Sequence, residues 1–158
     1  MTLATVTRSL ERILLTLWVG GLWMTGLVYA PVLFQSYARM VAGEIAGRLF
    51  SAMGLVSLGC GALLLAIAAL RNGRRVWPDW RTTVLLCMLV ITLIGEFGLA
   101  PRMQELKLFA AQHPPATEAW REFGRLHAVS GTLFLLNCLL GLVLVVLGIR
   151  PRSDQAGS

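Results

Sequence analysis

Four long apolar stretches constrain this chain more than any other feature of its sequence. They cover residues 13–34, 49–70, 82–100 and 126–149, and each is close to the ~20 residues that a helix needs to cross the hydrocarbon core of a bilayer. A segment in hydrocarbon must satisfy its own backbone hydrogen bonds, and none of the four shows the alternation typical of membrane β-barrel strands. The sequence therefore predicts an all-α fold, an integral membrane four-helix bundle.

Composition supports lipid as the main surroundings of the chain. Of its 158 residues, 56% are hydrophobic and 14% are charged, whereas ordinary soluble domains have about 45–50% and about 25%. The net charge of +6 does not indicate a nucleic-acid partner, because the basic residues lie at the ends of the apolar stretches, where they contact lipid headgroups. We expect one four-span membrane domain over residues 1–152 and a disordered tail over residues 153–158.

Basic residues that flank the stretches predict the orientation. Eight arginines lie near the N-terminus, in the connection over residues 71–81 and in the C-terminal tail, and four of these eight are in that one short connection. Positive charge is retained on the cytoplasmic side of a membrane. We therefore predict a multi-pass protein of the inner membrane with both termini in the cytoplasm.

The connection over residues 101–125 differs from the basic one. It carries two helical patterns, which His113-Pro114-Pro115 separates, because proline cannot continue the first helix and restricts the residue before it. The third and fourth spans are therefore predicted to extend beyond the membrane as an extracytoplasmic helical hairpin. Inspection of the sequence finds no internal repeat.

Glu96 is the one acid inside an apolar stretch. It lies five residues before Pro101, which places it about 8 Å from the end of its span at the rise of an α-helix. A carboxylate in hydrocarbon is costly unless it is paired or protonated, and such groups often mark functional sites. Two interpretations stay open: a proton or cation site, and a structural ion pair with Arg48, Arg102 or His127.

A second set of polar residues follows one face of the fourth stretch at helical spacing. It includes His127, Ser130 and Asn137, and polar and small residues of this kind usually face other helices in a membrane bundle. A haem held by two histidines is not expected, because the chain has two in total and His113 lies in the connection. We expect no cofactor and no disulfide framework, and the sequence defines no metal ligand.

Small residues and prolines predict how the helices pack. Glycines let helices approach closely in lipid, and prolines kink or end a helix, so Pro31 is expected to kink or end the first span near the outer face. The residues assigned to packing are Gly20, Gly21, Gly54, Gly61, Gly131, Pro31 and Pro101.

Three pieces of the sequence together resemble the transmembrane protein 205-like family of four-helix membrane proteins, which includes bacterial members of unknown function. The first is Trp18-Val19-Gly20-Gly21, followed by Pro31 and then Arg48-Leu49-Phe50. The second is Pro101-Arg102 before an amphipathic helix, and the third is Phe123 and His127, followed by Ser130 and Asn137. The resemblance implies four spans and a shared role for Pro101, Arg102, His127, Ser130 and Asn137, and it implies no reaction.

These features favour a non-enzymatic membrane protein with a polar site near the outer face that binds or helps move a small cation or solute. The residues expected to build the site are Glu96, Arg48, Arg102, His127, Ser130 and Asn137. A second hypothesis is a membrane oxidoreductase or a metal- or haem-handling protein that uses His127. A third is an assembly or quality-control partner of another membrane protein, within a homo- or hetero-oligomer.

Overall fold

Every regular element of the chain that the structure describes is a helix. The computed structural model describes residues 3–72, 79–113 and 117–148, so the predicted tail, Pro114, Pro115 and residues 73–78 of the basic connection lie outside the described residues. The elements, with η for a π-helical segment, are α1 (Leu3–Trp23), η1 (Met24–Tyr29), α2 (Ala30–Ser36), α3 (Arg39–Asn72), α4 (Trp80–Leu93), η3 (Ile94–Leu99), α5 (Ala100–Gln112) and α6 (Thr117–Gly148).

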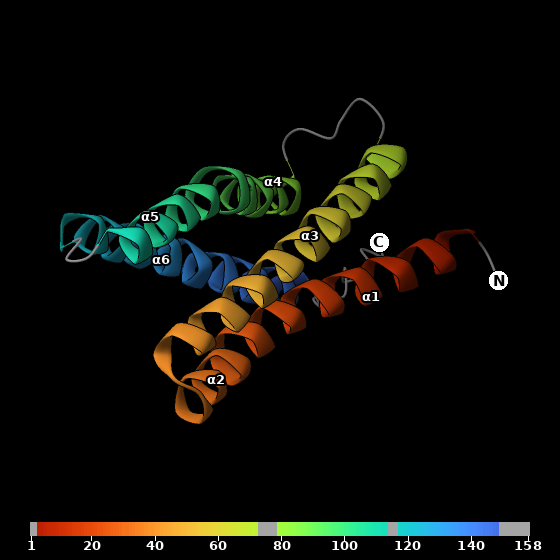
Figure 1. The fold of residues 1–158 in the computed structure, drawn as a ribbon. Coiled ribbons are helices and arrows are strands. Elements are labelled where there is room, and N and C mark those ends of the chain that lie inside the picture. The colour runs from red at the N-terminus through yellow and green to blue at the C-terminus, as the bar shows by residue number, and fades with distance from the viewer. Residues whose placement is uncertain (1–2, 73–78, 114–116, 149–158) are drawn as a thin grey trace, which may run out of the picture.

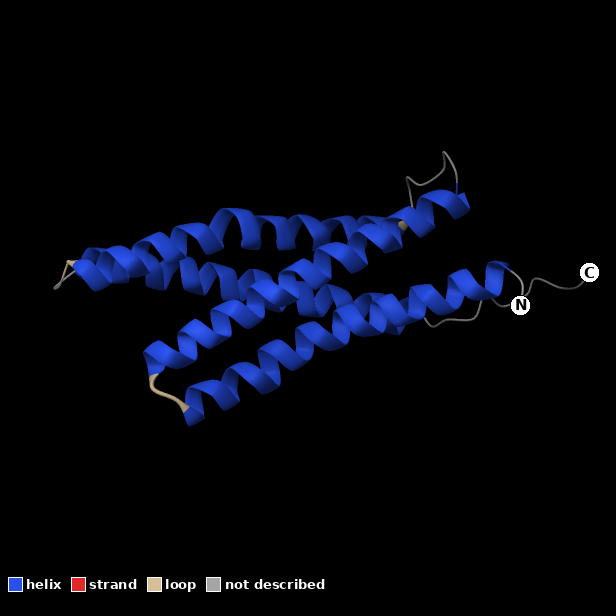
Figure 2. Ribbon diagram, turned by 45° about the vertical axis from the view of Figure 1, so that its right-hand side comes forward, coloured by secondary structure: helices blue, strands red, loops and turns tan. Residues whose placement is uncertain are grey.

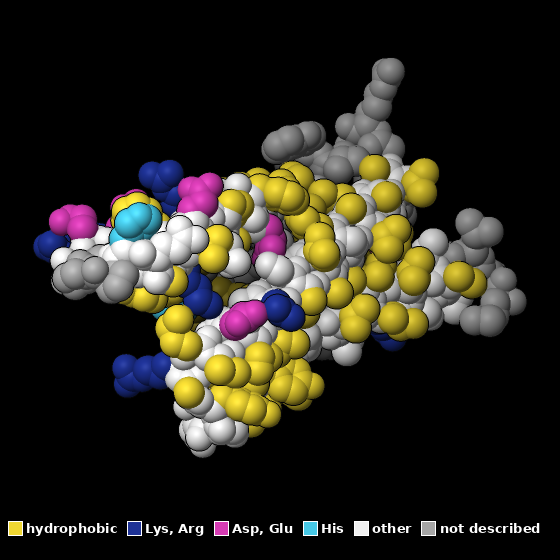
Figure 3. All heavy atoms as spheres, in the orientation of Figure 1, with side chains coloured by type: hydrophobic (Ala, Val, Ile, Leu, Met, Phe, Trp, Pro, Cys, Tyr) yellow, Lys and Arg dark blue, Asp and Glu magenta, His cyan; other side chains and the backbone are white. Residues whose placement is uncertain are grey.

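The expectation of four helices able to cross a membrane is confirmed in length and composition. Such helices cover Thr5–Ser36, Arg39–Leu70, Trp80–Gln112 and Thr117–Leu147, and only 17% to 39% of the most apolar stretch of each is buried inside the bundle. Figure 3 shows the resulting apolar surface over α1 and α3, with charged side chains gathered toward α5 and the start of α3. In water such helices would bury their apolar faces, so this surface fits hydrocarbon.

The elements form four helical rods, which are α1–η1–α2, α3, α4–η3–α5 and α6. The four rods are arranged in a ring. α1 packs against α3 and α6, and α4 packs against the same two helices. Figures 1 and 2 show that α1 and α4 begin, and α3 and α6 end, at one end of the bundle, while α2 and α5 lie toward the other. Trp18, Leu22, Met88 and Leu144 are among the buried residues at the centre.

Each of the two prolines assigned to packing follows a π-helical segment. Pro31 is the second residue of α2, directly after η1, and Pro101 is the second residue of α5, directly after η3. A proline ring crowds the carbonyl one turn earlier in an α-helix, and the wider π turn accommodates that carbonyl. Pro31 therefore does not end the first helix, which continues to Ser36.

The two halves of the chain share one design, which inspection of the sequence missed. Each half has an α-helix, a π segment, a second α-helix and then a long returning helix. Ala30-Pro31 and Ala100-Pro101 follow the two π segments, and Gly47-Arg48-Leu49 and Gly124-Arg125-Leu126 lie in the two returning helices. The shared residues are few and unequally spaced, so the repeat becomes clear only when the π segments are aligned.

Candidate functional site

Glu96 lies in η3 and faces α3. Its side chain is half-buried, and the Ser51 hydroxyl donates a hydrogen bond to its carboxylate. Gly54 lies directly opposite, and a Cβ on Gly54 would collide with the carboxyl group of Glu96. The missing side chain at position 54 therefore makes the space that the Glu96 carboxylate occupies.

The arginines that sequence reasoning offered as partners of Glu96 are engaged elsewhere. Arg48 donates to Glu44 at 2.8 Å, and Arg102 lies 3.7 Å from Glu105. All four of these side chains are more than half exposed. Within residues 3–72, 79–113 and 117–148, no ion pair includes Glu96. The interpretation of Glu96 as half of a structural ion pair with these arginines is therefore wrong.

His127 and Ser130 do not join Glu96 in one cluster of ligands. His127 is exposed on α6, where its ring stacks on Phe123 with centroids 5.9 Å apart, and Ser130 is half-buried. No group of three or more His, Cys, Asp or Glu residues in the described part of the chain is arranged to hold a metal ion. The described residues thus provide no set of metal ligands around His127.

Asn137 belongs to a hydrogen-bond chain in the core. Only 3% of this residue is exposed. Its Nδ2 donates to the Thr92 Oγ1 at 3.1 Å, and Thr92 donates to the Met88 carbonyl oxygen at 2.9 Å. The Asn137 Oδ1 is buried and has no hydrogen-bond partner among the residues that the structure describes. Thr92 precedes Glu96 by four residues on the same rod. The hydrogen bonds of Asn137 and Thr92 therefore lie next to the Glu96 site, on the side toward the start of α4.

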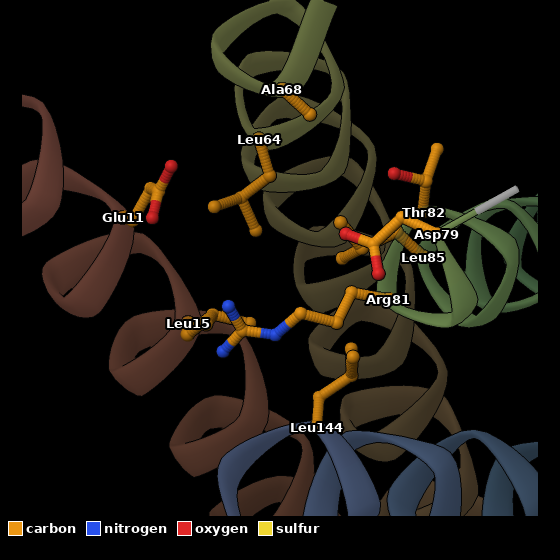
Figure 4. Close-up of a pocket in the computed structure, with 9 residues that line it drawn as sticks. All are labelled: Glu11, Leu15, Leu64, Ala68, Asp79, Arg81, Thr82, Leu85 and Leu144. Atoms are coloured by element: carbon orange, nitrogen blue, oxygen red, sulfur yellow. The ribbon is translucent and has the colours of Figure 1, made fainter. Parts of the chain in front are cut away.

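A second polar region, which sequence reasoning missed, lies at the end of the bundle where α1 and α4 begin. A cavity of about 50 Å³ opens there between four helices (Figure 4). Glu11 and Arg81 project toward it from α1 and α4. Glu11 precedes the first apolar stretch, but it lies four residues before Leu15 and seven before Trp18, so helical spacing could have placed it on the inward face.

Most of the residues described above lie in a region that matches a known protein family. Over residues 13–112 the sequence matches the family described as Domain of unknown function (DUF4149). The chain belongs to this family. Neither a curated protein nor a solved structure matches the chain. The DUF4149 region includes Glu96, Ser51 and Gly54, whereas α6, with His127 and Asn137, lies beyond it.

The Asn137–Thr92 contact gives a direct test of the packing in this DUF4149 protein. In a double-mutant cycle with Asn137→Ala and Thr92→Val, we expect a coupling free energy of about 0.6 kcal/mol, and at most about 1.7 kcal/mol, as for other hydrogen bonds between membrane helices. Unfolding in mixed micelles with a denaturing detergent would measure it. The same cycle with Thr83→Val is the control, because Thr83 is exposed. Equal coupling in both cycles would contradict the contact.

Proposed function

We propose that this protein is a multi-pass protein of the inner membrane, with both termini in the cytoplasm, that binds a proton or small cation at Glu96 and helps it move. The observation that carries the proposal is a carboxylate within a membrane-crossing helix that joins none of the ion pairs of the described residues. The basic residues support the orientation, which places Glu96 near the outer end of the bundle. The resemblance to the transmembrane protein 205-like family is compatible with this role.

The surroundings of Glu96 fit a bound positive charge. An ionised carboxylate removed from water loses hydration that nearby opposite charge must offset. The groups next to it, the Ser51 hydroxyl and the bare α-carbon of Gly54, add no charge. Oxygen ligands suit protons and hard cations more than soft metals. The π segment that holds Glu96 is also a kind of local structure that recurs at functional sites.

A hydrophobic carbodiimide tests this proposal without knowledge of the transported species, because it forms a stable adduct with a protonated carboxyl group in an apolar site. We expect an adduct on Glu96, located by mass spectrometry of the purified full chain. If Na⁺ or K⁺ binds at Glu96 and is present at about ten times its Kd for this site, carbodiimide labelling of Glu96 should slow about tenfold by mass action. If the site takes only protons, labelling should instead fall as the pH rises, with no effect of either salt.

Glu122 gives the matched control, because it lies 4.0 Å from Arg102 and its side chain is 49% exposed. We expect little adduct on Glu122, and the variant Glu122→Gln should label at Glu96 like the wild type. The variant Glu96→Gln should lose the adduct. A Glu96 that never reacts, or that reacts at a rate independent of both pH and salt, would show that the acid is structural. Association with other copies or other membrane proteins stays a prediction.

A further inference from the structure

The core next to Glu96 contains a buried oxygen that lacks a donor. Asn137 is 3% exposed, and its Oδ1 has no hydrogen-bond partner among the residues that the structure describes. The contact with Thr92 determines how the amide is oriented. The Thr92 hydroxyl uses its single proton on the Met88 carbonyl oxygen, so it can only accept from Asn137. The amide nitrogen therefore faces Thr92, and the atom without a partner is the oxygen, which is an acceptor.

The hydroxyl groups around Asn137 do not supply the missing donor. Thr25, Ser57 and Thr92 come from the three other rods, and each is at most 8% exposed. Each hydroxyl donates to the carbonyl oxygen four residues earlier on its own helix. The Trp18 Nε1 also has no partner among the described residues, but Trp18 leans toward the start of α1, away from the end toward which Asn137 leans. A buried acceptor without a donor costs free energy, so Asn137 favours an external group that carries a proton or a positive charge.

Glu96 and Asn137 converge from antiparallel helices. The rod that holds Glu96 runs toward the end of the bundle at which α6 begins (Figures 1 and 2), and η3 packs against α6. Side chains on a helix lean toward its N-terminus, so Glu96 leans toward Thr92 and Asn137 leans toward the start of α6. Thr92 lies about 6 Å before Glu96 along the axis of the rod, and its Oγ1 is 3.1 Å from the Asn137 Nδ2. The carboxyl group and the amide oxygen therefore approach the same space.

We propose that the Asn137 Oδ1 is the second ligand of the positive charge that binds at Glu96. This inference rests on the proposed function and adds a residue of α6 to the same site. A protonated Glu96 donates its hydrogen to the amide oxygen. An alkali cation is coordinated by the carboxylate and by the amide oxygen, which is a ligand of hard cations. In both cases the bound charge joins η3 to α6, in addition to the contact with α3 through Ser51.

Titratable side chains on the neighbouring elements are engaged or exposed elsewhere. Arg48 of α3 and Arg102 of α5 form ion pairs with exposed glutamates. Cys87 of α4 and His127 of α6 are exposed, and Cys138 of α6 lines a groove beside η1. A response of the Asn137 amide to pH or salt is therefore assigned to Glu96.

Asparagine resonances test the proposal directly, because the chain has two asparagines, Asn72 and Asn137. The purified full chain, isotope-labelled at asparagine, is placed in lipid nanodiscs for NMR. The Asn137 side-chain carbonyl resonance should shift when NaCl or KCl is added or, if only protons bind, when the pH is lowered in N-methylglucamine chloride. Asn72, the last residue of α3, should keep its resonance, and Asn72→Ser assigns that signal.

Glu96 should be required for this shift. Glu96→Gln should abolish it, whereas Glu122→Gln should keep it. An Asn137 resonance that shifts equally in Glu96→Gln overturns Asn137 as a ligand of this site. So does a constant resonance while carbodiimide labelling of Glu96 responds to pH or salt, because the oxygen then meets only a buried water, and the proposed function stands. Absence of any response at Glu96 overturns the proposed function and this inference with it.

Removal of the amide should weaken the site. In Asn137→Leu, which has a similar volume, the Kd of the cation that slows carbodiimide labelling should rise about threefold to tenfold, as for the loss of one hydrogen bond between membrane helices. If only protons bind, the pH of half-maximal labelling should instead fall by about 0.5 to 1 unit.

Thr132→Val is the control for this variant, because Thr132 is exposed on α6 and its hydroxyl donates to a carbonyl oxygen of the same helix. It should change neither the Kd nor the pH of half-maximal labelling. A folded Asn137→Leu that binds like the wild type contradicts the proposal. If Asn137→Leu does not fold, the asparagine resonances of the wild type and of Glu96→Gln decide it.

Discussion

Replacement of Trp18 by alanine should destabilise the bundle by about 3 to 5 kcal/mol, as expected when a large buried side chain is removed from a packed core. Trp18 is 0% exposed. Its ring lies so close to α3 that a Cβ on Gly61 would be 2.9 Å from the indole Cη2. Removal of the ring is therefore expected to leave a cavity between α1 and α3. The free energy of unfolding in mixed micelles measures the loss.

Trp80→Ala is the matched control for this prediction. Trp80 is 42% exposed, and substitutions at exposed positions usually change stability by less than about 0.5 kcal/mol. Trp18→Phe separates packing from polarity, because the Trp18 Nε1 is buried without a hydrogen-bond partner among the described residues. This variant should cost less than Trp18→Ala. Equal losses for Trp18→Ala and Trp80→Ala would show that Trp18 is not part of the core.

Substitution of Gly54 by alanine should disable the Glu96 site while the bundle stays folded. The added Cβ collides with the Glu96 carboxyl group, which is the far end of a flexible side chain. The carboxylate therefore moves away from Ser51, and the backbone stays in place. Because alanine favours a helix over glycine by about 1 kcal/mol, overall stability should not fall. We expect the protection of Glu96 by the cation that protects the wild type to disappear.

A shorter acid should restore the site. Glu96→Asp removes one methylene and withdraws the carboxylate from position 54, so the double variant Gly54→Ala/Glu96→Asp should regain part of the protection that Gly54→Ala loses. Gly59→Ala is the control on the same helix, because no atom lies within 4 Å of a Cβ built there. It should keep full protection. Full protection in Gly54→Ala would show that the position of the carboxylate does not matter.

The sequence was sufficient to predict the four helices, but it did not predict where each helix ends or where its backbone forms a π segment. Apolar stretches of ~20 residues determine helices in lipid, because the backbone has no other partner there. The observed helices run further, as α3 does from Arg39, because a helix can continue into water, where high hydropathy no longer indicates it. The π segments were not predicted, since a proline in an apolar stretch is compatible with a kink, an end or a wider turn.

The candidate site was predicted in type and only partly in arrangement. Glu96 stood out because one acid in an apolar stretch is conspicuous. Helical spacing could have paired Arg48 with Glu44, four residues earlier on the same helix. It could not show that Asn137 reaches Thr92, because that contact depends on the rotation of two different helices. Glu11 was missed because it precedes the apolar stretch, although it shares the inward face of α1.

The repeated design of the two halves has a consequence for the symmetry of the bundle. A hairpin of one rod and one returning helix, paired with a second copy, would build the same ring, so the protein has the organisation of a fused dimer. Gly26 stands five residues before Pro31, as Glu96 stands five before Pro101. A Cβ on Gly26 would meet the Phe134 ring. In the first half an aromatic ring thus occupies the place corresponding to the acid, so the two halves are alike in backbone and unlike in charge.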